Sequence, residues 1–444
     1  MLKKICIILI CVYVLVLSSV SCHRETTKDN FNVMAEPNDS NVTTDPEDSG
    51  LPYTVIEVDY ELEFISEFSE GYAAVYIDGH WGYMDTSGQL AIPNVFDYAE
   101  PFCDGTALVC ESFDSEENGW TPYYGLLGKD GKALVPVEYD WIDEFREGLA
   151  LVEKEGAFGY IDTTGKVVIP CRYEIANGFS EGLAVVFEDD KYGYIDKTGA
   201  SVIPCRYENA SDFTEGLAVV YDDGKYGFID TAGNTVIPIE YEFASSFSEG
   251  VAAVKGVGFA TGYGYIDKAG NTAIPFEYDM ANDFTDGIAL VKKIGDNDYS
   301  YIDKTGRAIV RHDEYIEVLS FSEGLVPARK SEGWGFINQT GELAIPYVYE
   351  GVSEHGFSDG LALVKNNNKW GFIDVDGNVV VPFDFDVLFE FVDGNAIAVV
   401  DGKYGIIDKT GNAIVPYIYE YIGYLNDGNA FIRNDNKWGI LNMS

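Results

Sequence analysis

The chain has 444 residues, of which 46% are hydrophobic and 23% are charged, and this composition argues against a largely disordered protein. Asp and Glu number 74 against 29 Lys and Arg, which gives a formal net charge of -45 at pH 7. Such an acidic surface repels phosphate backbones, so we expect no nucleic-acid partner. The 47 Gly, 31 Tyr and 26 Phe residues favour many short strands joined by tight turns.

The first 21 residues have the pattern of a secretion signal. Lys3 and Lys4 precede an apolar run over residues 5–17, and small residues then lead to Cys22. The stretch Leu-Ser-Ser-Val-Ser-Cys that ends at Cys22 resembles the lipobox of bacterial lipoproteins, which implies that this cysteine carries a lipid. Residues 22–50 then predict a lipidated N-terminus and a flexible polar tether. The expected location is outside the cytoplasm, lipid-anchored to the bacterial cell membrane or envelope surface.

Residues 51–444 are predicted to form one repeat domain, because three glycine-marked landmarks recur along them. The first is a turn of the type Phe-Ser-Glu-Gly, and the second is an aromatic residue followed by Gly. The third is an Asp-x-x-Gly turn with Pro five residues later. The first turn occurs in eleven units, with its glycine at Gly71, Gly105, Gly148, Gly182, Gly216, Gly250, Gly287, Gly324, Gly360, Gly394 and Gly428.

The spacing of these landmarks is nearly constant. The basic period is 34 residues, as from Gly182 to Gly216. Insertions lengthen three units, and all three fall between the first turn and the aromatic-Gly pair. The unit around Ser300 and Arg311 lacks both the glycine of that pair and the proline.

Each unit is predicted to be a small antiparallel meander. Residues 183–186 predict a first strand, residues 192–196 a second, and residues 202–204 the end of a third. Asp196 is then placed to cap the turn between the second and third strands. The glycine after each aromatic residue suits a bulge or a close backbone approach. The link over residues 205–213 could add a fourth short strand, and the sequence does not decide this.

These motifs resemble the WG-repeat family, also called KWG repeats. The closest matches are Lys-Trp-Gly-Phe-Ile-Asp at residues 369–374 and Lys-Trp-Gly-Ile-Leu at residues 437–441. The resemblance covers residues 64–442. It implies an all-β repeat protein of bacterial surface, lipoprotein or secreted contexts, without established catalytic residues.

The sequence favours an all-β tandem repeat of about eleven short antiparallel β-meander units in an open curved or superhelical array, and one or two β-propellers are the alternative. Residues 54–58 stand where a third strand would, and the chain stops after a second strand at Asn442. A ring closed by pairing its first and last strands would show this pattern, and so would an array with frayed ends.

Features outside the repeat are the candidates for binding. Trp120 and Tyr123 lie in the longest insertion, where departures from a repeat tend to carry function. A second candidate is a basic patch in two adjacent units, which suits an anionic partner or a role in neutralising the protein's own acids. Its residues are Lys292, Lys293, Arg307, Arg311, His312, Arg329 and Lys330.

The recurring polar residues are assigned to structure. The four histidines lack metal-ligand spacing, so we expect no metal, no cofactor and no catalytic residue. Turn capping explains the recurring Asp better than a calcium ladder does, and the acid before each turn glycine is interpreted as a solvated edge. Cys171 and Cys205 are either free thiols or a disulfide, and Cys103 could pair with Cys110.

The leading hypothesis for function is a non-enzymatic, membrane-tethered, exported repeat protein that acts as a protein–protein interaction scaffold. The alternative is a carbohydrate-binding cell-surface protein that uses loop aromatics such as Trp120 to stack on a glycan. An enzyme, such as a hydrolase with scattered carboxylates, is the third hypothesis. In all three the membrane is contacted through the lipid alone.

Overall fold

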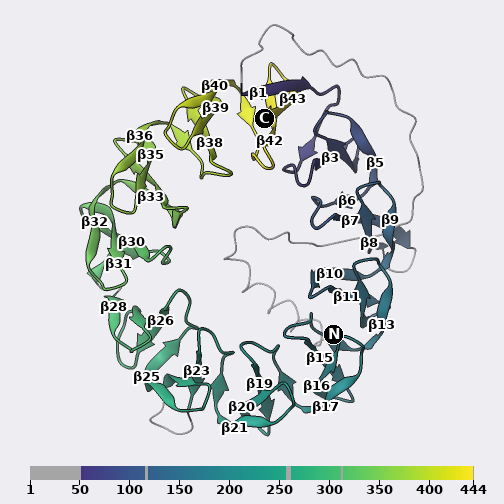
Figure 1. Ribbon diagram of the computed structural model, residues 1–444, viewed down its shortest axis with the longest axis vertical. Helices are drawn as coiled ribbons and strands as arrows, with labels where there is room; N and C mark the ends of the chain where they lie inside the picture. The colour runs from purple at the N-terminus through teal and green to yellow at the C-terminus, as the bar shows by residue number, and fades with distance from the viewer. Residues whose placement is uncertain (1–51, 116–118, 257–261, 312–313, 444) are drawn as a thin grey trace.

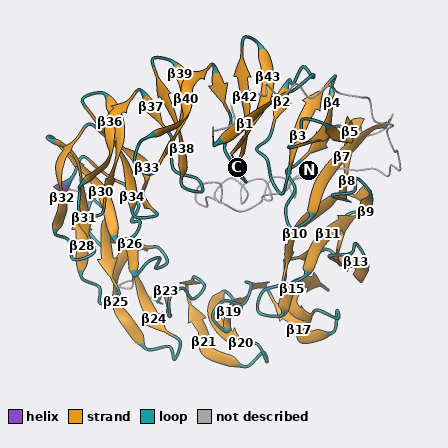
Figure 2. Cartoon of the chain, turned by 45° about the horizontal axis from the view of Figure 1, so that its top comes forward, coloured by secondary structure: helices purple, strands orange, loops and turns teal. Residues whose placement is uncertain are grey.

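The structure, a computed structural model, describes residues 52–115, 119–256, 262–311 and 314–443. Strands make up nearly all of its regular structure (Figure 2), and these ranges contain no α-helix. In the same ranges no helix is long and apolar enough to span a bilayer. Cys22 and His312 lie outside the described residues.

Each repeat unit forms an antiparallel sheet of four strands, which we call the inner, second, third and outer strands in order of their hydrogen bonding. The described residues contain nine four-stranded sheets and one seven-stranded sheet, in which two units share β25. The inner strands come from the link that precedes each unit, so the fourth short strand left open by the sequence is present. They are β2 (Phe64–Ile65), β6 (Tyr98–Ala99), β10 (Trp141–Arg146), β14 (Ile175–Ala176), β18 (Asn209–Ala210), β22 (Phe243–Ala244), the end of β25 (Thr272–Ala281), β29 (Glu317–Val318), β33 (Gly351–Ser358), β37 (Val387–Leu388) and β41 (Tyr421–Ile422).

The second and third strands of each unit form its central hairpin. The second strands are β3 (Tyr72–Ile77), β7 (Thr106–Ser115), β11 (Leu149–Lys154), β15 (Leu183–Glu188), β19 (Leu217–Asp222), β23 (Val251–Lys255), β26 (Ile288–Lys293), β30 (Leu325–Lys330), β34 (Leu361–Asn366), β38 (Asn395–Val400) and β42 (Asn429–Asn434). The third strands are β4 (His80–Asp85), β8 (Gly119–Gly128), β12 (Ala157–Asp162), β16 (Lys191–Asp196), β20 (Lys225–Asp230), β24 (Tyr263–Asp267), β27 (Ser300–Asp303), β31 (Gly333–Asn338), β35 (Lys369–Asp374), β39 (Lys403–Asp408) and β43 (Lys437–Met443).

The outer strands are longer than the sequence predicts. They are β5 (Leu90–Phe96), β9 (Ala133–Tyr139), β13 (Val167–Tyr173), β17 (Ser201–Tyr207), β21 (Thr235–Tyr241), the start of β25, β28 (Ala308–Arg311), β32 (Leu343–Tyr349), β36 (Val379–Phe385) and β40 (Ala413–Tyr419). Pro204 lies inside β17 rather than at its end. Between the pairs Tyr192↔Tyr207 and Tyr194↔Ile203, β17 has two residues more than β16. This bulge accommodates a proline, which has no N–H to donate to a ladder.

The all-β tandem array of meander units is confirmed, and its two ends, which we expected to be open, are joined. β1 (Tyr53–Glu57) pairs antiparallel with β43 over five residues and takes the place of the outer strand in the last unit. Figure 1 shows the units around a ring, with purple β1 beside yellow β43. Phe68 of the first unit also stacks on Phe431 of the last, with ring centroids 4.8 Å apart. Free ends would leave the edge of β43 unpaired and these rings exposed to water.

The hydrophobic core is a series of small clusters between neighbouring sheets. At the interface of the fourth and fifth units, the rings of Tyr194 and Phe213 lie 4.9 Å apart, and both side chains are almost fully buried. The Tyr194 hydroxyl donates a hydrogen bond of 2.8 Å to the carbonyl of Ser211. Tyr160 and Phe179 repeat this arrangement one interface earlier. Each sheet therefore buries its faces against its neighbours, as expected for a repeat protein.

Candidate functional site

The two rims of the ring carry different connections. Because consecutive strands of a meander are antiparallel, alternate connections lie at the same end of a sheet. In the fourth unit, the turns at residues 180–183 and 196–199 share one rim, which we call the turn face. The hairpin at residues 188–191 and the link to the next unit share the other rim, which we call the hairpin face. All three insertions lie between second and third strands, and therefore on the hairpin face.

On the turn face, the acidic residue before each turn glycine has a left-handed backbone conformation. Its φ is 51° at Glu147, 54° at Glu215 and 52° at Glu249. All eleven units share this feature, at Glu70, Asp104, Glu147, Glu181, Glu215, Glu249, Asp286, Glu323, Asp359, Asp393 and Asp427. A side chain other than glycine is uncommon in this region, so a compensating contact is expected.

In seven units the acid accepts a hydrogen bond from a backbone N–H of the next unit: Glu70, Glu147, Glu181, Glu215, Glu249, Glu323 and Asp427. The Glu215 carboxylate accepts a hydrogen bond of 3.1 Å from the backbone N–H of Gly250 and forms an ion pair of 3.0 Å with Lys268. A similar bond joins the first and last units, where the Asp427 carboxylate accepts at 2.8 Å from the backbone N–H of Glu70, the residue before the turn glycine. The interpretation of these acids as a solvated edge was incomplete, since they also link neighbouring units.

We expect the stability of the ring to fall in acid as these carboxylates are protonated. The hydrogen bond from Lys268 holds the pKa of Glu215 below its usual range, and Lys304 does the same for Glu249. A carboxyl group whose pKa is lower in the folded state stabilises the fold at every pH above its unfolded pKa of about 4.3. This stabilisation is lost as the pH falls through the folded pKa. Urea unfolding between about pH 6 and pH 3 measures how much the free energy of unfolding falls. The fall should be smaller in the double variant Glu215→Gln/Glu249→Gln, which lacks both carboxylates. The control Glu61→Gln changes an exposed acid and should show the same fall in the free energy of unfolding with pH as the wild type. If the double variant also showed the wild-type fall, Glu215 and Glu249 would not be the source of the acid sensitivity.

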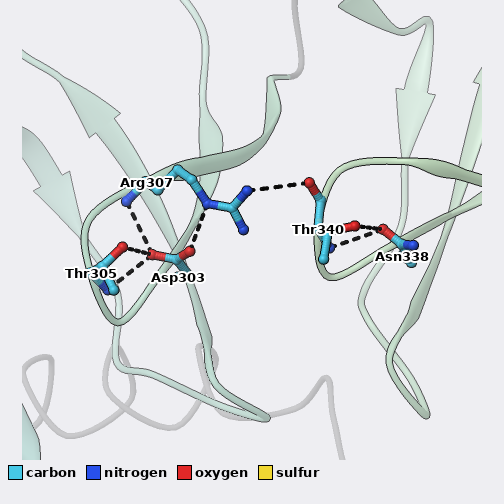
Figure 3. A network of polar contacts seen from close by, with 5 residues as sticks. All are labelled: Asp303, Thr305, Arg307, Asn338 and Thr340. Carbon is cyan, nitrogen blue, oxygen red and sulfur yellow. Dashed lines mark hydrogen bonds and ion pairs between the residues drawn. The ribbon is translucent and has the colours of Figure 1, made fainter.

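The recurring Asp at the end of each third strand caps a turn, as predicted. Asp162 Oδ1 accepts hydrogen bonds from the backbone N–H of Thr164 at 2.9 Å and of Lys166 at 3.1 Å. Figure 3 shows the same arrangement at Asp303, where Thr305 is the first donor. Within the described ranges, no group of three or more His, Cys, Asp or Glu is arranged to hold a metal ion.

Arg307 of the basic patch lies on the turn face and is engaged within the protein. Its Nε is 3.0 Å from Asp303 Oδ2, and its guanidinium also donates to the carbonyl of Thr340 at 3.5 Å (Figure 3). Because Asp303 and Thr340 belong to the seventh and eighth units, Arg307 bridges two neighbouring units. These contacts are of the kind that a neutralising role would use.

Four other cations of the patch lie at the ends of β26 and β30 on the hairpin face: Lys292, Lys293, Arg329 and Lys330. Lys293 pairs with Glu277 at 3.0 Å. The Lys330 ammonium is 4.7 Å from the ring centroid of Tyr315. Arg311 ends β28, opposite Ser300. The structure thus divides the patch between the two faces of the ring.

The longest insertion extends the hairpin of the second unit. β7 and β8 pair over ten residues each, with Asp114 opposite Trp120 and Glu111 opposite Tyr123. Tyr123 is half-buried and packs against the core cluster of the first two units. The side chain of Trp120 lies outside the described part of the structure. The insertion therefore projects from the hairpin face, with Tyr123 near its base.

Cys171 and Cys205 carry free thiols, so the disulfide alternative for this pair does not occur. Burial raises the pKa of both thiols, which lowers their reactivity. The predicted pairing of Cys103 with Cys110 is not tested, because the side chain of Cys110 lies outside the described part of the structure.

Sequence reasoning missed a cavity between the fifth and sixth units, where Ser211 and Ser246 contribute to the lining. The signal is visible once the units are aligned at the 34-residue period. Asn177 and Asp212 then occupy the positions of Ser211 and Ser246. The signal is that Ser211 and Ser246 replace the larger pair Asn177 and Asp212 at this interface.

Comparisons with known proteins describe the repeat. A sequence model of the family described as WG containing repeat matches ten segments of the chain: residues 81–112, 124–156, 158–192, 192–226, 226–255, 263–296, 299–333, 334–370, 370–404 and 404–438. A comparison with curated proteins gave no match.

Among solved structures, the chain has distant likenesses to the following three. The chain is similar to a eukaryotic initiation factor, with 12% identity, 68% of this chain and 94% of that chain covered, and a TM-score of 0.37. It is also similar to the extracellular domain of a one-component system of B. thetaiotaomicron, with 10% identity, coverages of 94% and 82%, and a TM-score of 0.24. For Hsv2p of Kluyveromyces lactis the identity is 10%, the coverages are 66% and 94%, and the TM-score is 0.23. TM-scores this low carry no argument about function.

Proposed function

We infer that this chain, which belongs to the family of WG containing repeat proteins, is an exported, lipid-tethered scaffold that binds other proteins and performs no catalysis itself. The proposal of export and anchoring is supported by the secretion pattern of residues 1–21, by Cys22 in its lipobox-like setting and by the polar segment that follows. The partner is a protein, and the membrane is reached through the lipid.

One observation carries the proposal for protein binding. The recurring polar groups of the turn face are used within the ring, whereas the departures from the repeat gather on the hairpin face. Irregular loops held on a rigid framework are where binding residues are usually found. The hairpin of the second unit is the longest of these departures, because its two strands pair over ten residues each.

The test compares three forms of the chain in its native envelope. The wild type should fractionate with membranes and incorporate a fatty-acid label, and Cys22→Ala should lose both because no lipid is attached. In the third form, residues 112–122 are replaced by Asp-Gly, which recreates the two-residue turn at Glu155 and Gly156 of the next unit. After chemical cross-linking, this trimmed form should lose partners that the wild type retains.

A matched control replaces Glu155 with Asp, which changes a hairpin without changing its length. It should retain every partner, and the thermal unfolding midpoints of all forms should agree. Recovery of the same proteins by the wild type and the trimmed form would count against the long hairpin as the binding element. Release of the wild type from membranes by salt alone would count against the lipid anchor.

A further inference from the structure

A cavity of about 290 Å³ lies between the fifth and sixth units. Its lining includes the buried Val219 and Ala244 and the half-buried Tyr221 and Tyr226. The exposed Asn209 is also part of the lining. This volume is close to the lower end of the range for small-molecule sites.

The cavity exists because two side chains that bridge the preceding interface are both serine here. Between the fourth and fifth units, the Asn177 amide donates a hydrogen bond of 3.0 Å to the Asp212 carboxylate. One 34-residue period later, the corresponding residues are Ser211 and Ser246, which are too short to meet in this way. Both serines line the cavity instead.

Asn209 adds a polar side chain to the lining. Ile175 and Phe243, one period before and after it, are large apolar residues at the same position of the inner strand. Asn209 uses its side-chain oxygen to accept from the backbone N–H of Ala210 at 2.8 Å. This bond fixes the orientation of the Asn209 side chain, and the side-chain NH2 group can still donate to a ligand.

The lining has the chemistry of a sugar site. Tyr221 and Tyr226 lie with ring centroids 4.6 Å apart at an interplanar angle of 49°, which gives an aromatic wall with phenol groups. The Ser246 hydroxyl and the Asn209 amide add donors and acceptors. The Ser211 hydroxyl is engaged within the protein, since it donates to the Asp212 carbonyl at 3.1 Å and accepts from the Val219 N–H at 3.0 Å. Among the described residues that line the cavity none is charged, although the chain as a whole has a net charge of -45. A neutral ligand with hydroxyl groups and an apolar C–H face matches this set, because aromatic rings cover the apolar face while a few polar groups orient it.

We propose that the cavity between the fifth and sixth units binds one neutral saccharide residue, with Tyr221 and Tyr226 against the sugar ring and Asn209 and Ser246 at its hydroxyls. This site goes beyond the scaffold function. It also differs in place from the carbohydrate hypothesis drawn from the sequence, which relied on Trp120 in the long hairpin.

The experiment is saturation-transfer difference NMR on the full-length chain. The probes are methyl β-D-glucopyranoside, methyl β-D-galactopyranoside, methyl α-D-mannopyranoside and N-acetylglucosamine, with sodium glucuronate as the charged comparison. At least one neutral probe should bind with a dissociation constant on the order of 1 mM, as expected for a ligand of this size. Glucuronate should bind more weakly because the protein is strongly acidic.

The decisive variant is Ser211→Asn/Ser246→Asp, which rebuilds the Asn177–Asp212 bridge and fills the cavity. It should keep the fold, because the preceding interface already carries this pair, and it should weaken binding about tenfold or more. Asn209→Phe introduces the residue found at the same position of the next unit, Phe243, removes the Asn209 amide from the lining and gives a second test. The matched control Asn177→Ser/Asp212→Ser alters the preceding interface and should leave the affinity for the probe unchanged.

Three results would overturn the proposal: no neutral probe binds, glucuronate binds more tightly than every neutral probe, or the cavity-filling variants bind as the wild type does. None of these results bears on protein partners of the long hairpin, because that hairpin belongs to the second unit. The two proposals therefore fail independently.

Discussion

Removal of residues 1–57, which deletes β1, is expected to lower the free energy of unfolding by about 5 kcal/mol. β1 and β43 pair over five residues, and each ladder hydrogen bond contributes about 1 kcal/mol net. Tyr53 also packs on the core cluster of the last two units. A loss of this size is a large part of the 5–15 kcal/mol typical of a folded domain. Urea unfolding followed by Trp fluorescence measures it.

The matched control is a chain that begins at residue 51, which lacks the tether and keeps β1. It should unfold at the same urea concentration as the wild type. Small-angle scattering should show a larger radius of gyration only for the chain that begins at residue 58, because only that chain can open. Equal unfolding midpoints for the two shortened chains would show that β1 does not hold the ring closed.

Gly193→Ala is expected to destabilise the protein by about 3 kcal/mol. A Cβ added at Gly193 would lie 2.6 Å from the backbone N of Cys205 and 2.6 Å from the carbonyl oxygen of Ile203. Both are backbone atoms of the bulged outer strand, so neither can move aside as a flexible side chain would. Overpacking of this kind costs about 1–3 kcal/mol, and the contact with backbone atoms places this site at the upper end. Thermal and urea unfolding measure the change.

Gly182→Ala provides the contrast within the same unit. Gly182 has a φ of 81°, and an added Cβ would meet nothing within 4 Å. Its replacement costs only the strain of an L-residue with positive φ, about 1 kcal/mol. If Gly182→Ala were the more damaging of the two, conformational freedom rather than close approach would be the main role of glycine in this repeat.

Much of the local structure could be predicted from the sequence, because each prediction depended on residues close together in the chain. The Asp162 turn cap is an example, since donors two and four residues away make the cap. The close approach at Gly193 is another, because a glycine next to an aromatic residue at a fixed distance from a proline indicates a bulge. The end of the outer strand was predicted too early, since Pro204 was taken as a stop although the bulge allows the strand to continue to Tyr207.

The candidate sites were harder to predict. The basic patch was a cluster in the sequence, yet the fold places Arg307 on one rim and Lys292 on the other. The cavity between the fifth and sixth units depends on side chains from two successive units that meet across an interface. Neither Ser211 nor Ser246 is unusual alone, and their effect appears only when their counterparts Asn177 and Asp212 are seen to touch.

The sequence by itself determined the eleven units, their meander of strands, the turns that join them and the single connection type that carries the insertions. The tertiary structure decided that the ends meet, that acids of the turn face such as Glu215 link neighbouring units, and that a cavity lies between the fifth and sixth units. The physical reason is that strands and turns depend on hydrogen bonds within one unit, which repeat with the period of the sequence. Closure depends on the small rotation between units summed over eleven interfaces, and the bond from Glu70 to Asp427 forms only when that sum completes a turn.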